Sequence, residues 1–437
     1  MDIFVGIVVG LFVLMFLVTA HEFGHFLMAR KNGVRVLEFG ICFPPRAIAW
    51  IKDPKTNKWR RYRRSEWKKD KITKAVISKG DDSGELAGRG MIFSLNWLPI
   101  GGFCQMDGES AADTREGTFG KASYWSKTKI LFGGVMMNWL VAFIILTILA
   151  WTGMPEFLDN QFTVEADTRI DQTPVKITSV AEDSPAEQAG LKADDYILAI
   201  NGVEVWKTDE ITELNKANAG KEVTYTISRE EWHDDAIECV DPPCPTFSEL
   251  KTVTKELTAT LNPADSEYLL GVTMSSEQAM SYSTWSAPIV GAGITLQVTG
   301  ETFKGVGTML WNLISGIGSQ LSFDADVRET GKEAISNAGD SVSGPIGIIG
   351  VLFPAFTASG PANLAFLAAV ISISLACMNV LPIPALDGGR WVLITIFKLR
   401  KKKLTREIEE KIVSRAFIVL LALIFIVTIL DIVRIVR

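Results

Sequence analysis

The chain opens with an apolar stretch at residues 3–27, IFVGIVVGLFVLMFLVTAHEFGHFL, with two histidines and a glutamate near its end. About 20 mainly apolar residues are needed to cross the hydrocarbon core of a bilayer as a helix, so this stretch predicts a membrane span. A cleaved signal peptide is disfavoured, because the segment lacks a basic beginning and its apolar run is too long. We therefore expect residues 1–28 to form a first transmembrane helix.

Apolar blocks recur further along the chain, which has 437 residues, 48% of them hydrophobic. Three more spans are expected, at residues 128–153, 362–390 and 416–437. The stretches 29–127 and 398–415 are basic, whereas the middle of the chain is acidic. Since basic loops stay in the cytoplasm, both basic stretches are predicted to be cytoplasmic, and the acidic middle and both chain ends extracytoplasmic. The sequence thus predicts a polytopic α-helical membrane protein with about four transmembrane helices.

Two strands are expected between the first and second spans. Residues 34–40 and 91–95 have the composition of strands, and turn residues follow each, Pro44-Pro45 and Gly101-Gly102. Residues 52–90, between the strands, form a hydrophilic, basic insertion that we expect to be a loop. Its basic and aromatic run could bind anionic lipid headgroups, but a solvated topology signal is the safer interpretation, and no nucleic acid is expected as a partner.

The acidic middle is predicted to contain a small α/β domain at residues 165–275. A short helix is expected at Ser184–Gly190, with serine as N-cap, proline at the first helical position and glycine at the end, between strand-like stretches. Cys239 and Cys244 lie close together in the same region. They either form a small disulfide or remain free thiols, and the sequence favours neither alternative.

Residues 284–357 are expected to lie on the membrane surface or to re-enter the membrane. Their two most apolar pieces, Trp285–Leu296 and Ile346–Phe356, are too short to span a bilayer and contain glycine or proline. Residues 291–317 mix apolar with small polar residues and could form an amphipathic helix at the membrane surface.

The most reactive part of the sequence is His21-Glu22-Phe23-Gly24-His25. Two histidines four positions apart project from one face of a helix and can bind one metal ion, while Glu22 can take a proton from metal-bound water. Zinc suits this chemistry because it lowers the pKa of bound water and polarises a carbonyl. The plain alternative is two histidines and a surface glutamate at a helix end. Ionisable groups inside an apolar helix are costly, which favours a functional site.

A catalytic zinc site needs a third protein ligand, and we expect it from another span. The third span ends in NVLPIPALDGG at residues 379–389, where Asp387 is the suitable carboxylate. The predicted topology places Asp387 and both histidines at the cytoplasmic ends of their spans, and therefore at one level. Pro382 and Pro384 are expected to break the helix just before Asp387. A plain helix end with a turn is the alternative.

Several motifs resemble the site-2 proteases, which are intramembrane zinc metalloproteases, and in particular the bacterial branch that cleaves membrane-anchored anti-sigma factors. The matching stretches are His21–His25, Leu98–Phe103, Asp107–Glu109, Gly133–Asn138, Ser343–Gly347 and Asn379–Gly389. They follow the family's order over nearly the whole chain, which makes the combination highly specific.

The resemblance implies a Zn²⁺ cofactor with His21, His25 and Asp387 as ligands and Glu22 as general base. It makes Asn138 and Asn379 candidates for holding the substrate backbone or the oxyanion, although an interhelical hydrogen bond is an equal alternative for Asn138. The two strands resemble the family's membrane-associated β-hairpin, which could hold an unwound substrate as an added strand or be purely structural.

The small domain resembles a PDZ domain of the permuted bacterial type, with an extracytoplasmic location implied. In the family such domains act as size filters, and recognition of a trimmed chain end is the rival role. The chain departs from the closest branch in having one such domain instead of two, in its basic insertion, and in Phe39–Pro45 where a glycine-rich turn is usual.

The sequence and the resemblance together predict a zinc-dependent intramembrane endopeptidase in the cytoplasmic membrane, with its active site towards the cytoplasm. Its substrate would be a single-span, anti-sigma-factor-like membrane protein trimmed beforehand by another protease. A catalytically silent PDZ scaffold and a metal transporter are the alternatives. All four catalytic side chains are present, which disfavours a scaffold, and the ionisable groups cluster at one level, which disfavours a transport pathway. The oligomeric state cannot be predicted.

Overall fold

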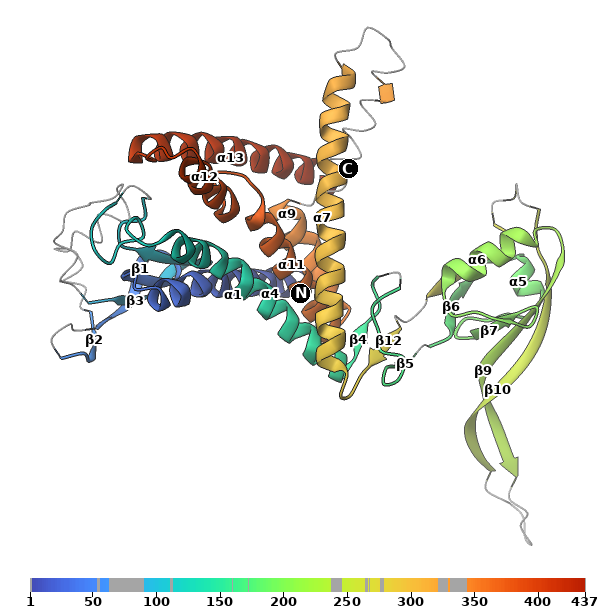
Figure 1. Cartoon of the computed structure of the whole chain (residues 1–437). Helices are drawn as coiled ribbons and strands as arrows, with labels where there is room; N and C mark the ends of the chain where they lie inside the picture. The colour runs from blue at the N-terminus through green and yellow to red at the C-terminus, as the bar shows by residue number, and fades with distance from the viewer. Residues whose placement is uncertain are drawn as a thin grey trace. The chain divides into compact units, whose positions relative to one another are not determined.

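The computed structural model describes residues 2–52, 56–62, 90–110, 113–158, 160–171, 173–236, 246–263, 266, 268–275, 279–320, 329–330 and 344–436. The chain forms two compact units (Figure 1). The first comprises Met1–Met154, Asn160–Asp167 and Ser283–Arg437, and the second comprises Pro155–Asp159 and Thr168–Tyr282. Cys239 and Cys244 lie outside the described residues, as does most of the basic insertion.

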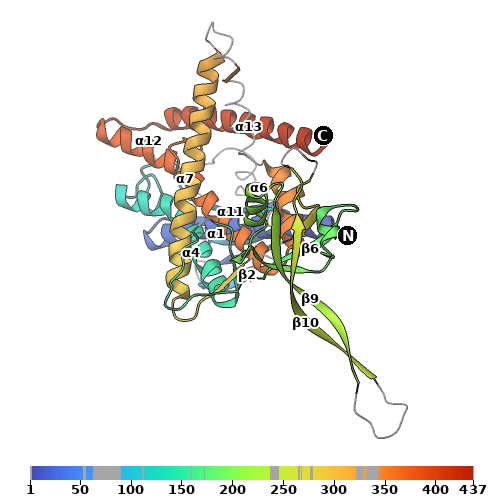
Figure 2. The same cartoon turned by 90° about the vertical axis from the view of Figure 1, so that its right-hand side faces the viewer.

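Four helices in the described part of the chain are long and apolar enough to cross a membrane. They are α1 (Asp2–Lys31), α4 (Tyr124–Thr152), α11 (Pro361–Val380) and α13 (Arg406–Val436). The helices α1 and α11 both pack against α4, and the three lie together in two perpendicular views (Figures 1 and 2). Each predicted span overlaps one of these helices, and the protein is a polytopic membrane protein. The fourth helix begins earlier than predicted, because α13 starts at Arg406 within the stretch 398–415 that was expected to be a loop.

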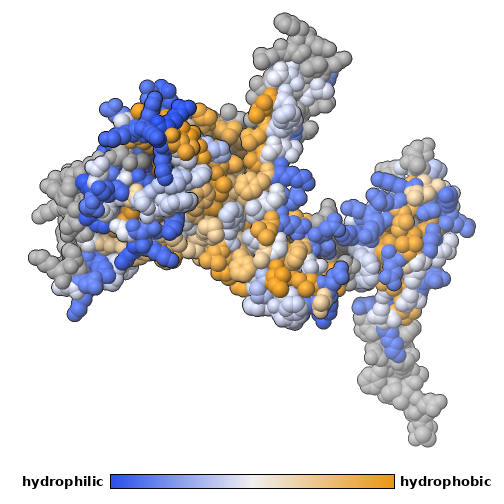
Figure 3. All heavy atoms as spheres, in the orientation of Figure 1, coloured by the Kyte–Doolittle hydropathy of each residue, from blue (hydrophilic) through white to orange (hydrophobic). Residues whose placement is uncertain are grey.

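The exposed side chains of the first unit fit a lipid environment. Along α13, Ile418, Val419 and Phe425 are 65%, 69% and 67% exposed, and a large exposed apolar surface of this kind marks contact with a membrane or another protein. Hydrophobic side chains cover the helices between α7 and α12 (Asp387–Leu399) in Figure 3, whereas hydrophilic ones gather where α12 leads into α13. This pattern separates a lipid-facing belt from a water-facing end.

The break between α11 and α12 follows from two prolines. The helix α11 ends at Val380, and the chain then turns through Pro382 and Pro384 before α12 begins at Asp387. Proline lacks a backbone N–H and its ring clashes with the preceding turn, so the helix cannot continue through this stretch. The predicted break is confirmed, and it leaves Asp387 at the first position of a new helix.

A three-stranded sheet in the order β2-β1-β3 lies between the first two spans in the sequence. Its strands are β1 (Val36–Lys52), β2 (Trp59–Arg61) and β3 (Ile92–Met106). The predicted turns are confirmed by the strand register. Leu95 pairs with both Ile41 and Ile48, and Ile41 pairs with both Leu95 and Gly102, so the chain reverses around Pro44-Pro45 and again just before Gly102. The register shifts between Phe43 and Arg46, so the prolines sit at an irregularity where no ladder hydrogen bond is required of them. The predicted loop at 52–90 also contains a strand, β2.

The helix α7 (Ala287–Gln320) contains the helix predicted at residues 291–317 and continues without a break from the apolar piece Trp285–Leu296. Small polar residues interrupt its apolar pattern but do not break the helix. The other apolar piece is a short helical segment made of α9 (Pro345–Gly347), the π-helical turn η2 (Ile348–Leu352) and α10 (Phe353–Ala358). Asp431 on α13 accepts hydrogen bonds from the backbone N–H groups of Gly344 and Gly347, which fixes the start of this segment.

The second unit is built on a sheet with the order β10-β9-β7-β6-β11, with β8 added to β7. Its strands are β6 (Val175–Val180), β7 (Tyr196–Ile200), β8 (Val203–Glu204), β9 (Glu222–Ala236), β10 (Thr246–Thr260) and β11 (Val272–Ser275). The helices α5 (Pro185–Gln188) and α6 (Thr208–Ala217) complete it, while β4 (Met154–Pro155), β5 (Arg169–Asp171) and β12 (Met280–Tyr282) are short strands near its ends. The helix predicted at Ser184–Gly190 is confirmed, because Ser184 caps the N–H of Glu187 and Gly190 adopts a φ of 84°. The strands β9 and β10 extend as a long ribbon beyond the rest of the sheet (Figures 1 and 2).

Candidate metal centre

The three predicted ligands meet in one place. His21 and His25 lie one turn apart on α1, and their Nε2 atoms are 3.1 Å apart. Asp387, from the start of α12, places Oδ2 3.1 Å from His21 Nε2 and 3.2 Å from His25 Nε2. Both histidines are buried, with 8% and 7% of their surface exposed. Two elements far apart in the sequence therefore form a compact triangle of two nitrogens and one oxygen.

This triangle has the size that a tetrahedral zinc ion requires. Zinc bonds of about 2.0–2.1 Å at tetrahedral angles separate the ligand atoms by roughly 3.3 Å, close to the three distances observed. Two imidazoles and one carboxylate form a donor set of catalytic zinc sites, which keep a fourth position open for water or substrate. The residues present thus fit a catalytic zinc ion.

Each imidazole is oriented by a contact on its other nitrogen. His25 Nδ1 lies 2.8 Å from the carbonyl oxygen of Ile130, so the Nδ1–H donates there and the Nε2 lone pair faces the triangle. His21 Nδ1 lies 3.4 Å from Asn138 Nδ2, and Asn138 is completely buried. The Asn138 Oδ1 atom has no hydrogen-bond partner in the described part of the chain. Turning the amide about its axis would let this oxygen accept the His21 Nδ1–H.

Glycines allow α4 to pass directly beside the histidines. A Cβ atom on Gly134 would lie 2.6 Å from His21 Cε1 and 2.7 Å from the Nε2 atoms of both histidines. A Cβ on Gly24 would lie 2.2 Å from the Gly133 carbonyl oxygen. No real Cβ atom sits so close to such neighbours, so α1 and α4 can only approach this closely through glycine. The Gly133-Gly134 pair therefore serves the geometry of the ligand triangle.

Glu22 lies beside the triangle and faces the sheet. Its Oε2 accepts a hydrogen bond of 3.1 Å from the backbone N–H of Cys104 on β3. Glu22 also lines a cavity of about 600 Å³. The other lining residues are Phe43, Pro44, Leu98, Phe103, Cys104, Gln105 and Glu109. A carboxylate next to the metal ligands thus borders a space large enough for several residues of another chain.

Comparison with known proteins gives the family. The model of peptidase family M50 matches residues 9–60 and 71–424. The chain belongs to peptidase family M50. This confirms the resemblance to the site-2 proteases. The regulator of sigma-W protease RasP of Bacillus subtilis is 25% identical over 481 aligned positions, which cover 99% of both chains. The zinc metalloprotease RasP of Shouchella clausii is 28% identical over 310 positions, covering 71% of this chain and 60% of the other.

Asn379 has a different environment from the other candidate residues of this M50 protein. Its Nδ2 donates to the carbonyl oxygen of Leu375, one turn earlier on α11, at 3.0 Å. Within the residues that the structure describes, no hydrogen bond or ion pair joins Asn379 to the ligand triangle. The structure therefore brings together His21, His25, Asp387, Glu22 and Asn138, and leaves Asn379 bonded to its own helix.

Three features of the M50 site were not predicted from the sequence. The Ile130 carbonyl acts through the backbone, so its residue type carries no signal. Gly134 was noted as part of a motif, but its contact with the histidines depends on how α1 and α4 cross. Glu109 was also noted as part of a motif, and its place at the cavity depends on the path of β3.

Proposed function

We propose that this M50 protein is a zinc-dependent intramembrane endopeptidase. The observation that carries the proposal is the buried triangle of His21 Nε2, His25 Nε2 and Asp387 Oδ2, with the Glu22 carboxylate beside it. The names of its relatives, which include a zinc metalloprotease, support zinc as the metal. A polytopic membrane fold around this site supports cleavage within or beside a transmembrane segment.

The chain's own residues have distinct parts in the proposed reaction. Zinc, when bound, makes water nucleophilic near neutral pH and polarises the scissile carbonyl. Glu22 takes the proton from the attacking water and returns it to the leaving amide nitrogen. Before substrate adds to β3, the Cys104 N–H holds the Glu22 carboxylate beside the triangle. Asn138 orients His21, and Asn379 turns from its own helix to stabilise the developing oxyanion.

The proposed substrate is a single-span membrane protein of the anti-sigma-factor type, trimmed beforehand by another protease. Its support is the likeness to a protein named as a regulator of sigma-W. A helical substrate must be unwound, and the sheet of β1 and β3 offers an edge to which it can add as a strand. We further propose that this sheet is the membrane-associated hairpin, that the second unit is an extracytoplasmic PDZ-like domain acting as a size filter, and that the active site faces the cytoplasm from the cytoplasmic membrane.

Metal removal tests the proposed enzyme class. Purified protein in detergent is incubated with a single-span model peptide of about 20 leucine and alanine residues interrupted by a central Asn-Gly. We expect cleavage to stop when a zinc chelator is added and to return with stoichiometric zinc, since the open coordination position is where reaction occurs. Metal flux into proteoliposomes without cleavage of any single-span peptide would instead support a transporter.

Two asparagine variants separate orientation of a ligand from oxyanion binding. Asn138→Ala is expected to weaken zinc affinity by about 10- to 100-fold, as losing a partner of a metal-binding histidine typically does. Asn379→Ala is expected to leave zinc affinity unchanged and to lower kcat by about 100-fold, the usual effect of losing one oxyanion donor. Zinc affinity by competition with a chromophoric chelator and kcat on the model peptide provide the two readouts. Unchanged zinc affinity in Asn138→Ala would contradict the orienting role.

A further inference from the structure

Residues 102–106 of β3 form an outer edge of the sheet beside the metal centre. They pair on one side with β1, as in the pairs Phe39 with Cys104 and Gly40 with Phe103, and no other described strand pairs with their opposite side. On that open side, alternate backbone N–H groups point away from β1. The Cys104 N–H donates to Glu22 Oε2, and the Met106 N–H donates to Glu109 Oε1 at 3.0 Å.

Two carboxylates therefore occupy the edge positions where an added strand would place its carbonyl oxygens. Donors two residues apart on one strand are separated by about 6.6–6.8 Å, the repeat of an extended chain. Both carboxylates also line the cavity of about 600 Å³, together with Phe103, Gln105 and others. An extended segment entering this cavity meets Glu22 and Glu109 before it meets the strand edge.

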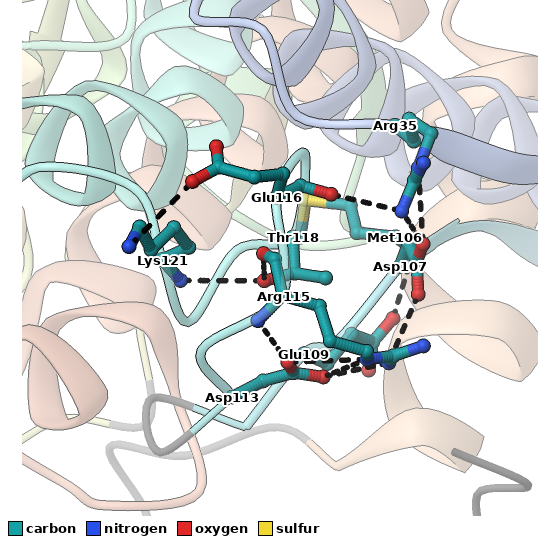
Figure 4. Close-up of polar contacts among 9 residues, drawn as sticks. All are labelled: Arg35, Met106, Asp107, Glu109, Asp113, Arg115, Glu116, Thr118 and Lys121. Atoms are coloured by element: carbon teal, nitrogen blue, oxygen red, sulfur yellow. Dashed lines mark hydrogen bonds and ion pairs between the residues drawn. The ribbon is translucent and has the colours of Figure 1, made fainter. Parts of the chain in front are cut away.

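The loop that carries Glu109 is firmly anchored through its neighbours. Asp107, which is 3% exposed, accepts hydrogen bonds from Arg35 at 2.8 and 3.1 Å and from Arg115 at 3.3 Å (Figure 4). The Glu109 carbonyl oxygen accepts a hydrogen bond from Arg390 Nη2, and the Arg390 Nε lies 3.3 Å from Glu409 Oε1. The backbone at Glu109 is thus held from both sides.

The Glu109 side chain is held much less firmly. The residue is exposed, and in the described part of the chain its carboxylate forms no ion pair. Its hydrogen bond to the Met106 N–H is a local contact across three residues, which can break by rotation of the side chain alone. By contrast, Met106 is 8% exposed, so its N–H would be a buried donor without a partner if Glu109 left and nothing replaced it.

We propose that Glu109 is a positioning residue that holds the place of a substrate carbonyl on the Met106 N–H. An extended substrate segment adds to residues 102–106 by displacing the Glu109 carboxylate, while the anchored loop keeps the edge itself in place. When no substrate is bound, Glu109 accepts the hydrogen bond of the Met106 N–H. Each arriving substrate must compete with Glu109 for this donor. This inference rests on the proposed proteolytic function and adds to it the residue that substrate must displace.

The competition between Glu109 and substrate is measured by peptide binding to a protein that cannot cleave the peptide. The full-length zinc-loaded Glu22→Gln protein and its Glu109→Ala derivative are titrated with the dye-labelled model peptide described above. The net contribution of such a hydrogen bond changes an equilibrium constant by about a factor of 3 to 10. We therefore expect Glu109→Ala to bind the peptide about 3- to 10-fold more tightly than the parent. Glu109→Gln, which keeps a weaker neutral acceptor, should lie between the two.

Glu116→Ala is the matched control, because it removes the same charge from the same loop. The Glu116 carboxylate pairs with Lys121 at 3.6 Å and is 90% exposed (Figure 4). We expect its peptide affinity to equal that of the parent. Equal or weaker binding by Glu109→Ala, or tighter binding by Glu109→Gln than by Glu109→Ala, would overturn the proposal.

A kinetic measurement separates this inference from the proposed function. In protein with Glu22 intact, Glu109→Ala should lower KM for the model peptide by the same factor as it lowers the dissociation constant. Cleavage by the parent with an unchanged or raised KM in Glu109→Ala would leave the protease assignment standing and reject the role of Glu109. Tighter binding by Glu109→Ala without cleavage by any form would support the edge competition and reject the protease assignment.

Discussion

Glu22→Gln is expected to lower kcat for cleavage of a single-span peptide by about 10²- to 10⁴-fold, the range that a general base contributes. The amide keeps the size of the side chain and can still accept the Cys104 N–H, but it cannot take a proton from water. Zinc should remain bound at one ion per chain, because the triangle of His21, His25 and Asp387 does not include Glu22. Metal analysis and peptide cleavage on the same preparation measure both effects.

Glu116→Gln provides the comparison for this experiment, since it makes the same chemical change at an exposed glutamate away from the triangle. Its kcat and zinc content should match those of the parent. Cleavage by Glu22→Gln at the parent's rate would rule out the proposed base, and loss of zinc together with activity would show that Glu22 is a ligand. In cells, a single-span protein that accumulates in the Glu22→Gln membrane proteome would identify the substrate.

The proposed metal ligands could be predicted because each step of the prediction concerns one segment of the chain. A helix fixes the relation of His21 to His25 without any knowledge of the fold. Asp387 required more, namely a topology inferred from loop charges and a helix break inferred from two prolines. Both steps concern single membrane segments. Such a segment can adopt few structures, because it must be apolar and must satisfy its backbone hydrogen bonds internally. The structure places all three ligand atoms within hydrogen-bonding distance of one another.

The sheet and α7 were harder to predict, because their limits depend on contacts between segments. Pro44-Pro45 is a turn signal and the chain does reverse there, but the sequence does not show that residues 92–95 insert between the segments before and after the turn, as the pairing of Leu95 with both Ile41 and Ile48 requires. Similarly, small polar residues mark a possible end of an apolar segment, but α7 continues through them. The side-chain contact between Glu109 and the Met106 N–H has no sequence pattern at all, since it depends on the path of β3 past α1.

Gly134→Ala is expected to reduce zinc affinity by at least about 100-fold, the upper end of what an indirect perturbation of a zinc ligand does. The added methyl would lie 2.7 Å from the Nε2 atoms of both His21 and His25, which are the atoms that face the metal. To accept it, either both imidazoles must turn away or α4 must move from α1. Movement of α4 would also carry away Asn138 and the Ile130 carbonyl, which orient the same two rings.

The difference in helix propensity between glycine and alanine would not explain such a loss of zinc affinity. Alanine favours a helix over glycine by about 1 kcal/mol, so Gly134→Ala should stabilise α4 if packing were indifferent to the methyl. Gly300→Ala makes the same change within α7, where nothing lies within 4 Å of the new Cβ, and it should leave zinc affinity unchanged. Zinc affinity measured by chelator competition therefore distinguishes the two sites. If Gly134→Ala bound zinc as the parent does, the close passage of α4 beside the histidines would not be what shapes the metal centre.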